Sequence, residues 1–169
     1  QAIPAMSLLT AKPGEEGSPA RAKSRIAALG SLEQRAWPKE GRYAPALSGP
    51  AARLLASMAA EDGRKLKQGG CKNAFCNGTL PEDEAITAKP PQDCPRPKKG
   101  AFWKLSKALH GLARPAHHWR AAISAHLTED LGFKAMDHGK CVFKCQPFPG
   151  KPPICLGLYA DDFAYCSKP

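Results

Sequence analysis

Near the end of the chain the sequence reads Ile154-Cys155-Leu156-Gly157-Leu158-Tyr159-Ala160-Asp161-Asp162-Phe163-Ala164-Tyr165-Cys166. Two apolar runs meet at two adjacent acids, a pattern that predicts a β-hairpin with both carboxylates at its tip. Adjacent carboxylates repel each other unless water surrounds them or a cation lies between them, and hard oxygen ligands suit Mg²⁺. The pair is therefore either a metal-binding tip or a solvated turn, in which Asp is common.

Two further segments precede this hairpin in a fixed order. The first is Cys71-Lys72-Asn73-Ala74-Phe75-Cys76-Asn77-Gly78-Thr79-Leu80, and the second is Phe102-Trp103-Lys104-Leu105-Ser106-Lys107-Ala108-Leu109-His110-Gly111-Leu112. Together with Tyr159-Ala160-Asp161-Asp162, they resemble the reverse transcriptase of copia-type retrotransposons. That family reads approximately Asp-Val-Lys-Asn-Ala-Phe-Leu-Asn-Gly, then Lys-Leu-x-Lys-Ala-Leu-Tyr-Gly-Leu, then Tyr-Val-Asp-Asp. The ordered set of motifs is far more specific than an isolated Asp-Asp pair.

The resemblance covers residues 19–169, and residues 1–18 are expected to be a mobile tail because they show no clear apolar period. Residue patterns predict a strand over 23–29, a helix over 50–60, a buried strand end at 72–76 and a strand over 141–145. Trp119, Ile123, Leu127 and Leu131 recur at every fourth residue and predict the core face of a helix. Proline-rich segments at 89–100 and 147–153 predict loops.

This mixture of helices and mainly antiparallel strands predicts an α+β fold. The resemblance implies, more specifically, the fingers and palm of a polymerase right hand, in a partial domain whose thumb is missing. It also implies a reaction, RNA-templated synthesis of DNA from deoxynucleotides, in which two Mg²⁺ ions assist phosphoryl transfer. The implied partners are an RNA or DNA template-primer and deoxynucleoside triphosphates.

The resemblance assigns roles to individual residues. Asp161 and Asp162 would be catalytic and would hold the metal ions, and Lys23 and Arg25 would lie near the incoming triphosphate. Phe75 stands where the family has an aromatic gate under the nucleotide sugar, and Gly111 would allow close backbone approach to the nucleotide. The alternatives remain that Phe75 is a core residue, that Gly111 only serves a turn and that Arg25 is a surface charge.

One position departs from the family pattern in a way that concerns the chemistry. The first catalytic Asp of the family should stand five residues before Phe75, and that position is Gly70. The loss of one carboxylate predicts weaker Mg²⁺ binding and an enzyme that is inactive in this copy. We therefore expect a decayed, truncated element.

The charge of the chain is strongly positive. The formal net charge is +10, and no Asp or Glu occurs from Cys94 to Thr128. This pattern favours a polyanionic partner, although a solvated basic face is an equal alternative. The candidate nucleic-acid contacts in this stretch are Lys98, Lys99, Lys104, Lys107, Arg114 and Arg120. Two alternatives to a reverse transcriptase therefore remain. The chain could be a non-catalytic remnant that binds nucleic acid, or a chain that does not fold stably.

Seven cysteines exclude a fully paired disulfide framework, and their spacings do not form a paired zinc-binding pattern. We expect reduced, mostly buried thiols and an intracellular location, in the cytoplasm or the nucleus. The sequence contains no run of 18 apolar residues, so it predicts no transmembrane helix and no membrane partner.

Overall fold

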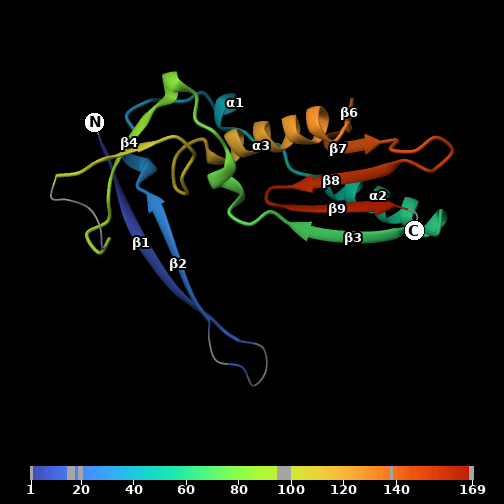
Figure 1. Ribbon diagram of the computed structural model, residues 1–169, viewed down its shortest axis with the longest axis horizontal. Coiled ribbons are helices and arrows are strands. Elements are labelled where there is room, and N and C mark those ends of the chain that lie inside the picture. The colour runs from blue at the N-terminus through green and yellow to red at the C-terminus, as the bar shows by residue number, and fades with distance from the viewer. Residues whose placement is uncertain (1, 15–17, 19–20, 95–99, 138, 168–169) are drawn as a thin grey trace.

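The computed structural model describes residues 2–14, 18, 21–94, 100–137 and 139–167. These residues form two β-sheets together with α-helices and short helical turns, which confirms an α+β architecture. Figure 1 shows the two sheets side by side, with β1 and β2 extending away from the remainder as a long two-stranded ribbon.

The four-stranded sheet has the order β2-β1-β4-β5 and consists of β1 (Ile3–Lys12), β2 (Arg21–Ala28), β4 (Ile86–Lys89) and β5 (Trp103–Leu105). The five-stranded sheet has the order β3-β9-β8-β7-β6 and consists of β3 (Lys65–Gly70), β6 (Lys134–Met136), β7 (Gly139–Cys145), β8 (Ile154–Tyr159) and β9 (Asp162–Ser167). Every pairing within the five-stranded sheet is antiparallel, and β7 confirms the strand expected over 141–145.

The helical elements connect and cover these sheets. The α-helices are α1 (Lys39–Arg42), α2 (Gly49–Glu61) and α3 (Pro115–Ala125), and a π-helical turn, η4 (His126–Asp130), continues α3. Three short 3₁₀ turns are η1 (Gly30–Leu32), η2 (Ala74–Asn77) and η3 (Glu82–Glu84).

The predicted hairpin is confirmed as β8 and β9, and it divides the core into two layers. Side chains alternate between the faces of a strand. Cys155 and Cys166 therefore pack on one face with Leu55 and Ala59 of α2. Leu156 and Leu158 lie on the opposite face and pack with Phe143 and Leu127. The five-stranded sheet is thus covered by α2 on one face and by α3 with η4 on the other.

The helix predicted over 50–60 is confirmed as α2, and its boundaries follow from its end residues. Ser48 precedes it, and the Ser48 hydroxyl accepts a hydrogen bond from the Ala51 amide at 3.3 Å. Gly63 follows it with φ of +59°, a conformation that glycine adopts without strain.

Residues 3–12 correct the expectation of a mobile tail over residues 1–18. They form β1, which pairs with β2 along its length from Ala5 opposite Ala28 to Lys12 opposite Arg21. It also pairs in parallel with β4. The run of Ala, Ser, Thr and Leu carries no clear apolar alternation, so the order of this strand comes from its hydrogen-bonding neighbours.

Two other expectations also need correction. The strand expected to end over 72–76 ends at Gly70, because Asn73 adopts a left-handed conformation (φ 54°) that turns the chain into η2. Leu131 was expected on the core face of the helix, but its side chain is 49% exposed. The π turn of η4 offsets the helical repeat after Ala125, which moves Leu131 away from the stripe that buries Trp119 and Leu127.

The described parts of the two proline-rich segments carry no helix and no strand beyond the end of β4 at Lys89. Residues 95–99 of the first segment lie outside the described residues. Among the helices that the structure describes, none is long and apolar enough to span a membrane.

Candidate functional site

The two acids lie at the tip of the β8–β9 hairpin, and both side chains are exposed. Ala160 and Asp161 form the turn, in which Ala160 has φ of +52°. Two hydrogen bonds fix this turn from the neighbouring elements. The Trp119 indole donates to the Ala160 carbonyl at 2.9 Å, and the Cys71 amide donates to the Asp161 carbonyl at 2.7 Å. The position of the turn is therefore fixed through two of its backbone carbonyl groups, and neither of these two hydrogen bonds involves a carboxylate of Asp161 or Asp162.

Gly70 lies directly beside this tip. It is the last residue of β3, and it pairs with Asp162 across the sheet. A Cβ atom built on Gly70 would lie 2.8 Å from Asp162 Oδ1 and 3.8 Å from the Asp161 carbonyl oxygen. A side chain at position 70 would thus stand next to the carboxylate of Asp162, which belongs to a flexible side chain that can move aside.

The residues present do not complete a metal site at this tip. Asp161 and Asp162 supply two carboxylates, but position 70 contributes no side-chain oxygen. Within the part of the chain that the structure describes, no group of three or more His, Cys, Asp or Glu side chains is placed to hold a metal ion. The donor set therefore does not match a site built from three carboxylates.

A cavity of about 560 Å³ opens next to Asp161 and collects most of the predicted nucleotide-binding residues. Lys23, Arg25, Phe75 and Asp161 all line it. Phe75 packs edge-to-face against His110, with ring centroids 5.5 Å apart, and His110 also lines the cavity. Residues far apart in the sequence thus meet at one concave surface.

The cavity also contains cations that the sequence patterns missed. Lys12 and Arg21 lie opposite each other at the outer end of the described β1–β2 pair, and Lys72 contributes from the segment after β3. Lys12 was overlooked because it falls within residues 1–18, which were expected to be a tail. The alternation of Arg21, Lys23 and Arg25 along a strand was the available signal for a shared face.

The electrostatics of the cavity follow from this crowding of positive charge. Partial desolvation lowers the pKa of the Lys23 ammonium, and the charges of Arg25, Lys12 and Arg21 lower it further, whereas Asp161 opposes the change. Cys71 lines the same cavity, and burial raises the pKa of its thiol, while Asp161 and Asp162 raise it further. Cys71 therefore remains a neutral thiol beside the acids.

Gly111 does not line this cavity, and the structure gives it a packing role. Its φ is +89°, and a Cβ atom there would lie 2.1 Å from the Ala28 carbonyl oxygen. The neighbouring His110 carbonyl accepts a hydrogen bond from the Ala28 amide at 2.7 Å. Glycine at 111 therefore lets this segment approach the end of β2.

The candidate nucleic-acid contacts separate into three groups. Lys104 and Lys107 are exposed, and Lys98 and Lys99 lie outside the described residues. Arg114 is mostly buried, where it pairs with Glu84 and donates to the Gly41 carbonyl at 2.7 Å. Arg120 bonds to the Lys140 carbonyl and lies 5.1 Å from the centre of the Phe143 ring.

The guanidinium groups of Arg114 and Arg120 are thus committed to intramolecular contacts. A stretch of basic residues in the sequence does not indicate which of its side chains are exposed and which are paired. Arg114 and Arg120 therefore could not be distinguished from the exposed lysines by sequence alone. We do not retain these two arginines as nucleic-acid contacts.

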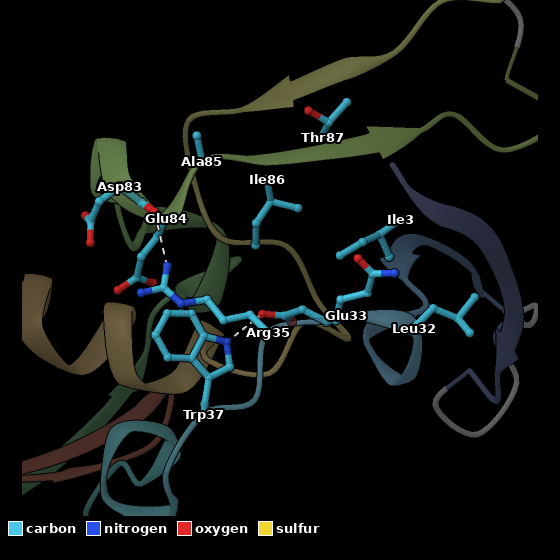
Figure 2. Close-up of a pocket in the computed structure, with 11 residues that line it drawn as sticks. Ile3, Leu32, Glu33, Arg35, Trp37, Asp83, Glu84, Ala85, Ile86 and Thr87 are labelled. Carbon is cyan, nitrogen blue, oxygen red and sulfur yellow. Dashed lines mark hydrogen bonds between the residues drawn. The ribbon is translucent and has the colours of Figure 1, made fainter. Parts of the chain in front are cut away.

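A second, smaller cavity of about 250 Å³ lies away from the acids, between the loop at residues 32–37 and the start of β4 (Figure 2). Several of its polar groups contact each other. Trp37 donates to Glu33 at 2.6 Å, and Arg35 donates to the Asp83 carbonyl at 3.1 Å while its guanidinium lies 4.0 Å from the centre of the Trp37 ring. This network ties the loop to η3.

Comparison with known proteins identifies the relatives of the chain. The family described as "Reverse transcriptase (RNA-dependent DNA polymerase)" matches residues 1–169. The chain is 26% identical over 155 residues to the retrovirus-related Pol polyprotein from transposon RE1 of Arabidopsis thaliana, and 25% identical over 155 residues to that from transposon RE2 of the same organism. Each alignment covers 92% of this chain and 10% of the polyprotein. No solved structure matches.

Proposed function

The chain belongs to the reverse transcriptase (RNA-dependent DNA polymerase) family, and we propose that its two sheets are the fingers and palm of a polymerase right hand. The four-stranded sheet with its β1–β2 ribbon would be the fingers, and the five-stranded sheet with the Asp-Asp hairpin would be the palm. The chain spans about a tenth of the length of the Pol polyproteins that it matches. The proposal therefore concerns one portion of such a polyprotein.

The ancestral activity that we propose is RNA-templated DNA synthesis, with deoxynucleotides and a template-primer as substrates and Mg²⁺ as the cofactor. The observation that carries this proposal is the position of Gly70 opposite Asp162. Three chain positions at which the family pattern has an acid, 70, 161 and 162, meet at one hairpin tip. The same tip borders a cavity lined by Lys23, Arg25 and Phe75.

We further propose that this chain does not catalyse nucleotide incorporation at an appreciable rate, because Gly70 supplies no carboxylate. Only Asp161 and Asp162 would bind a divalent ion, so we assign no metal-dependent step to the chain. Metal ions stabilise the transition state of phosphoryl transfer by several kcal/mol. Since 1.36 kcal/mol is a factor of ten, the loss of this stabilisation slows the reaction by about a thousandfold or more.

The experiment that tests this proposal restores the acid and measures incorporation. Gly70→Asp is made in this chain and in a chain extended at residue 169 by the thumb of a related reverse transcriptase. Gln68→Asp is the control, because it adds the same charge two residues earlier on the same strand. In the extended chain, incorporation should require Gly70→Asp. Full activity of the thumb fusion with Gly70 unchanged would refute the assignment.

A non-catalytic role in nucleic-acid binding is a second candidate, and the exposed cations favour it. Lys104 and Lys107 are exposed, and one face of the β1–β2 ribbon carries further cations. Contacts to phosphates release counterions, so affinity for a template-primer should fall steeply between 50 and 200 mM salt. Affinity that is independent of salt would count against this role.

A further inference from the structure

Two buried cysteines lie opposite each other near the open end of the β8–β9 hairpin. Cys155 of β8 pairs directly with Cys166 of β9 in the strand register. Directly paired side chains lie on the same face of a sheet, and both thiols pack there against Leu55 and Ala59 of α2. Figure 1 shows the hairpin tip at one end of these strands and α2 near the other end. None of the other pairings between described strands sets two cysteines opposite each other.

The spacing of this pair suits a covalent link. Directly paired residues of antiparallel strands have Cα atoms about 4.5–5.5 Å apart. Disulfides join residues whose Cα atoms are about 4.4–6.8 Å apart. A sulfur–sulfur bond between Cys155 and Cys166 therefore requires no change in the register of the two strands.

Burial protects the reduced pair but does not seal it. Burial raises the pKa of the Cys155 thiol, and the neighbouring Cys166 thiol raises it further, so the unreactive protonated form predominates at neutral pH. Cys155 and Cys166 are 6% and 0% exposed. Yet the pair lies one residue from the start of β8 at Ile154 and one residue from the end of β9 at Ser167. Strand ends open locally at a smaller cost in free energy than global unfolding, so an oxidant reaches the pair when this end of the hairpin frays.

We infer that Cys155 and Cys166 are a reversible disulfide site, at which a small-molecule disulfide such as oxidised glutathione links β8 to β9 covalently. The Cys155 thiolate, on the more exposed of the two residues, attacks one sulfur of the small disulfide and releases one of its thiols. The Cys166 thiolate then attacks the Cys155 sulfur of the mixed disulfide, and the second small thiol leaves. The protein pair loses two electrons and two protons, and the small disulfide gains both. The link fixes the open end of the hairpin whose tip carries the two acids.

The test exposes the whole folded chain to oxidised glutathione without denaturant, alkylates the remaining thiols and identifies linked peptides by mass spectrometry. The peptide that joins Cys155 to Cys166 should exceed every other cysteine–cysteine link by about tenfold or more, because the paired strands hold the two thiols at a high effective concentration. Excess reduced glutathione should remove the link. Absence of the link from the folded chain, or its formation only in urea, would overturn the inference.

Substitutions show whether the strand register selects the pair. In Cys166→Ala the reaction should stop at the mixed disulfide of Cys155 with glutathione. Cys141→Ala is the matched control, because Cys141 is also buried but has no cysteine opposite it in the described strand register. This variant should form the link as the parent chain does. A link from Cys155 to a different cysteine in Cys166→Ala, at the yield of the parent, would refute the assignment.

Amide hydrogen exchange measures what the link does to the hairpin. The amides at the open ends of β8 and β9 should exchange about fivefold more slowly, or slower still, in the oxidised chain than in the reduced chain, because the link prevents these ends from separating. Exchange in α1, which lies outside the hairpin, is the internal reference and should not change. Equal exchange at the open ends in the oxidised and reduced chains would contradict the inference that the disulfide fixes this end of the hairpin.

Discussion

The substitution Glu84→Gln tests how the two sheets are held together. Glu84 lies in η3, just before β4, and it contacts two residues at the start of α3. It forms an ion pair with Arg114, and its Oε2 atom lies 2.9 Å from His118 Nε2, close but poorly aligned for a hydrogen bond. The three side chains are 7–14% exposed. This buried cluster therefore links the four-stranded sheet to the helix that covers the five-stranded sheet.

The loss of stability expected for Glu84→Gln follows from the burial of the ion pair between Glu84 and Arg114. Removing one partner of a buried ion pair leaves the other charge without compensation and costs about 3 kcal/mol or more. For a domain of this size, 1 kcal/mol shifts the midpoint of thermal unfolding by about 2–4 °C. Glu84→Gln should therefore lower the melting temperature by about 6–12 °C, measured by circular dichroism at pH 7.

A matched control comes from an exposed carboxylate that contacts a histidine. Asp130 and His126 lie 2.7 Å apart, and their side chains are 67% and 55% exposed. Exposed pairs contribute less than about 1 kcal/mol, so Asp130→Asn should shift the melting temperature by less than about 4 °C. Equal shifts for Glu84→Gln and Asp130→Asn would refute the claim that burial makes the Glu84 cluster important.

Two further predictions concern a glycine and a histidine. Gly111→Ala should prevent stable folding or lower the free energy of unfolding by more than roughly 3 kcal/mol, because it adds a clash with Ala28 to the cost of a positive φ. Gly150 also has a positive φ, of +74°, but open space surrounds it, so Gly150→Ala should cost only about 1 kcal/mol. Urea unfolding of both variants checks this difference. Burial lowers the pKa of His118 below its usual value, an effect that Glu84 opposes. The unfolded chain therefore binds the proton more readily, so stability is complete above pH 6.5, roughly, and declines as the pH falls below that value. Unfolding free energies at pH 7.5 and 5.5 should differ less in His118→Gln, and an unchanged difference would contradict this assignment.

Sequence patterns predicted those parts of the fold that depend on local chemistry. The β8–β9 hairpin follows from two apolar runs around Asp161 and Asp162, and α2 follows from Pro50 and Gly63 at its ends. These signals are local, since strand period and helix capping act over a few residues. The meeting of Gly70 with the acids followed only from the ordered family motifs.

Features that depend on tertiary contacts were not predictable in this way. β1 is ordered by its pairing with β2 and β4, although its own sequence has no clear period. Arg114 belongs to a stretch of positive charge in the sequence, yet its side chain is mostly buried, where it forms an ion pair with Glu84, thirty residues earlier. Contacts between residues that are distant in the chain follow no fixed spacing, so a single sequence does not predict them.

The most direct measurement of the central claim is a Mg²⁺ titration of the parent chain, Gly70→Asp and Gln68→Asp, followed by calorimetry. A carboxylate about 4 Å from a divalent ion contributes about 2 kcal/mol even at the dielectric constant of water, or roughly thirtyfold in affinity. We predict that Gly70→Asp binds Mg²⁺ at least tenfold more tightly than the other two chains. Equal Mg²⁺ affinities for Gly70→Asp and Gln68→Asp would contradict the claim that position 70 is the missing third acid.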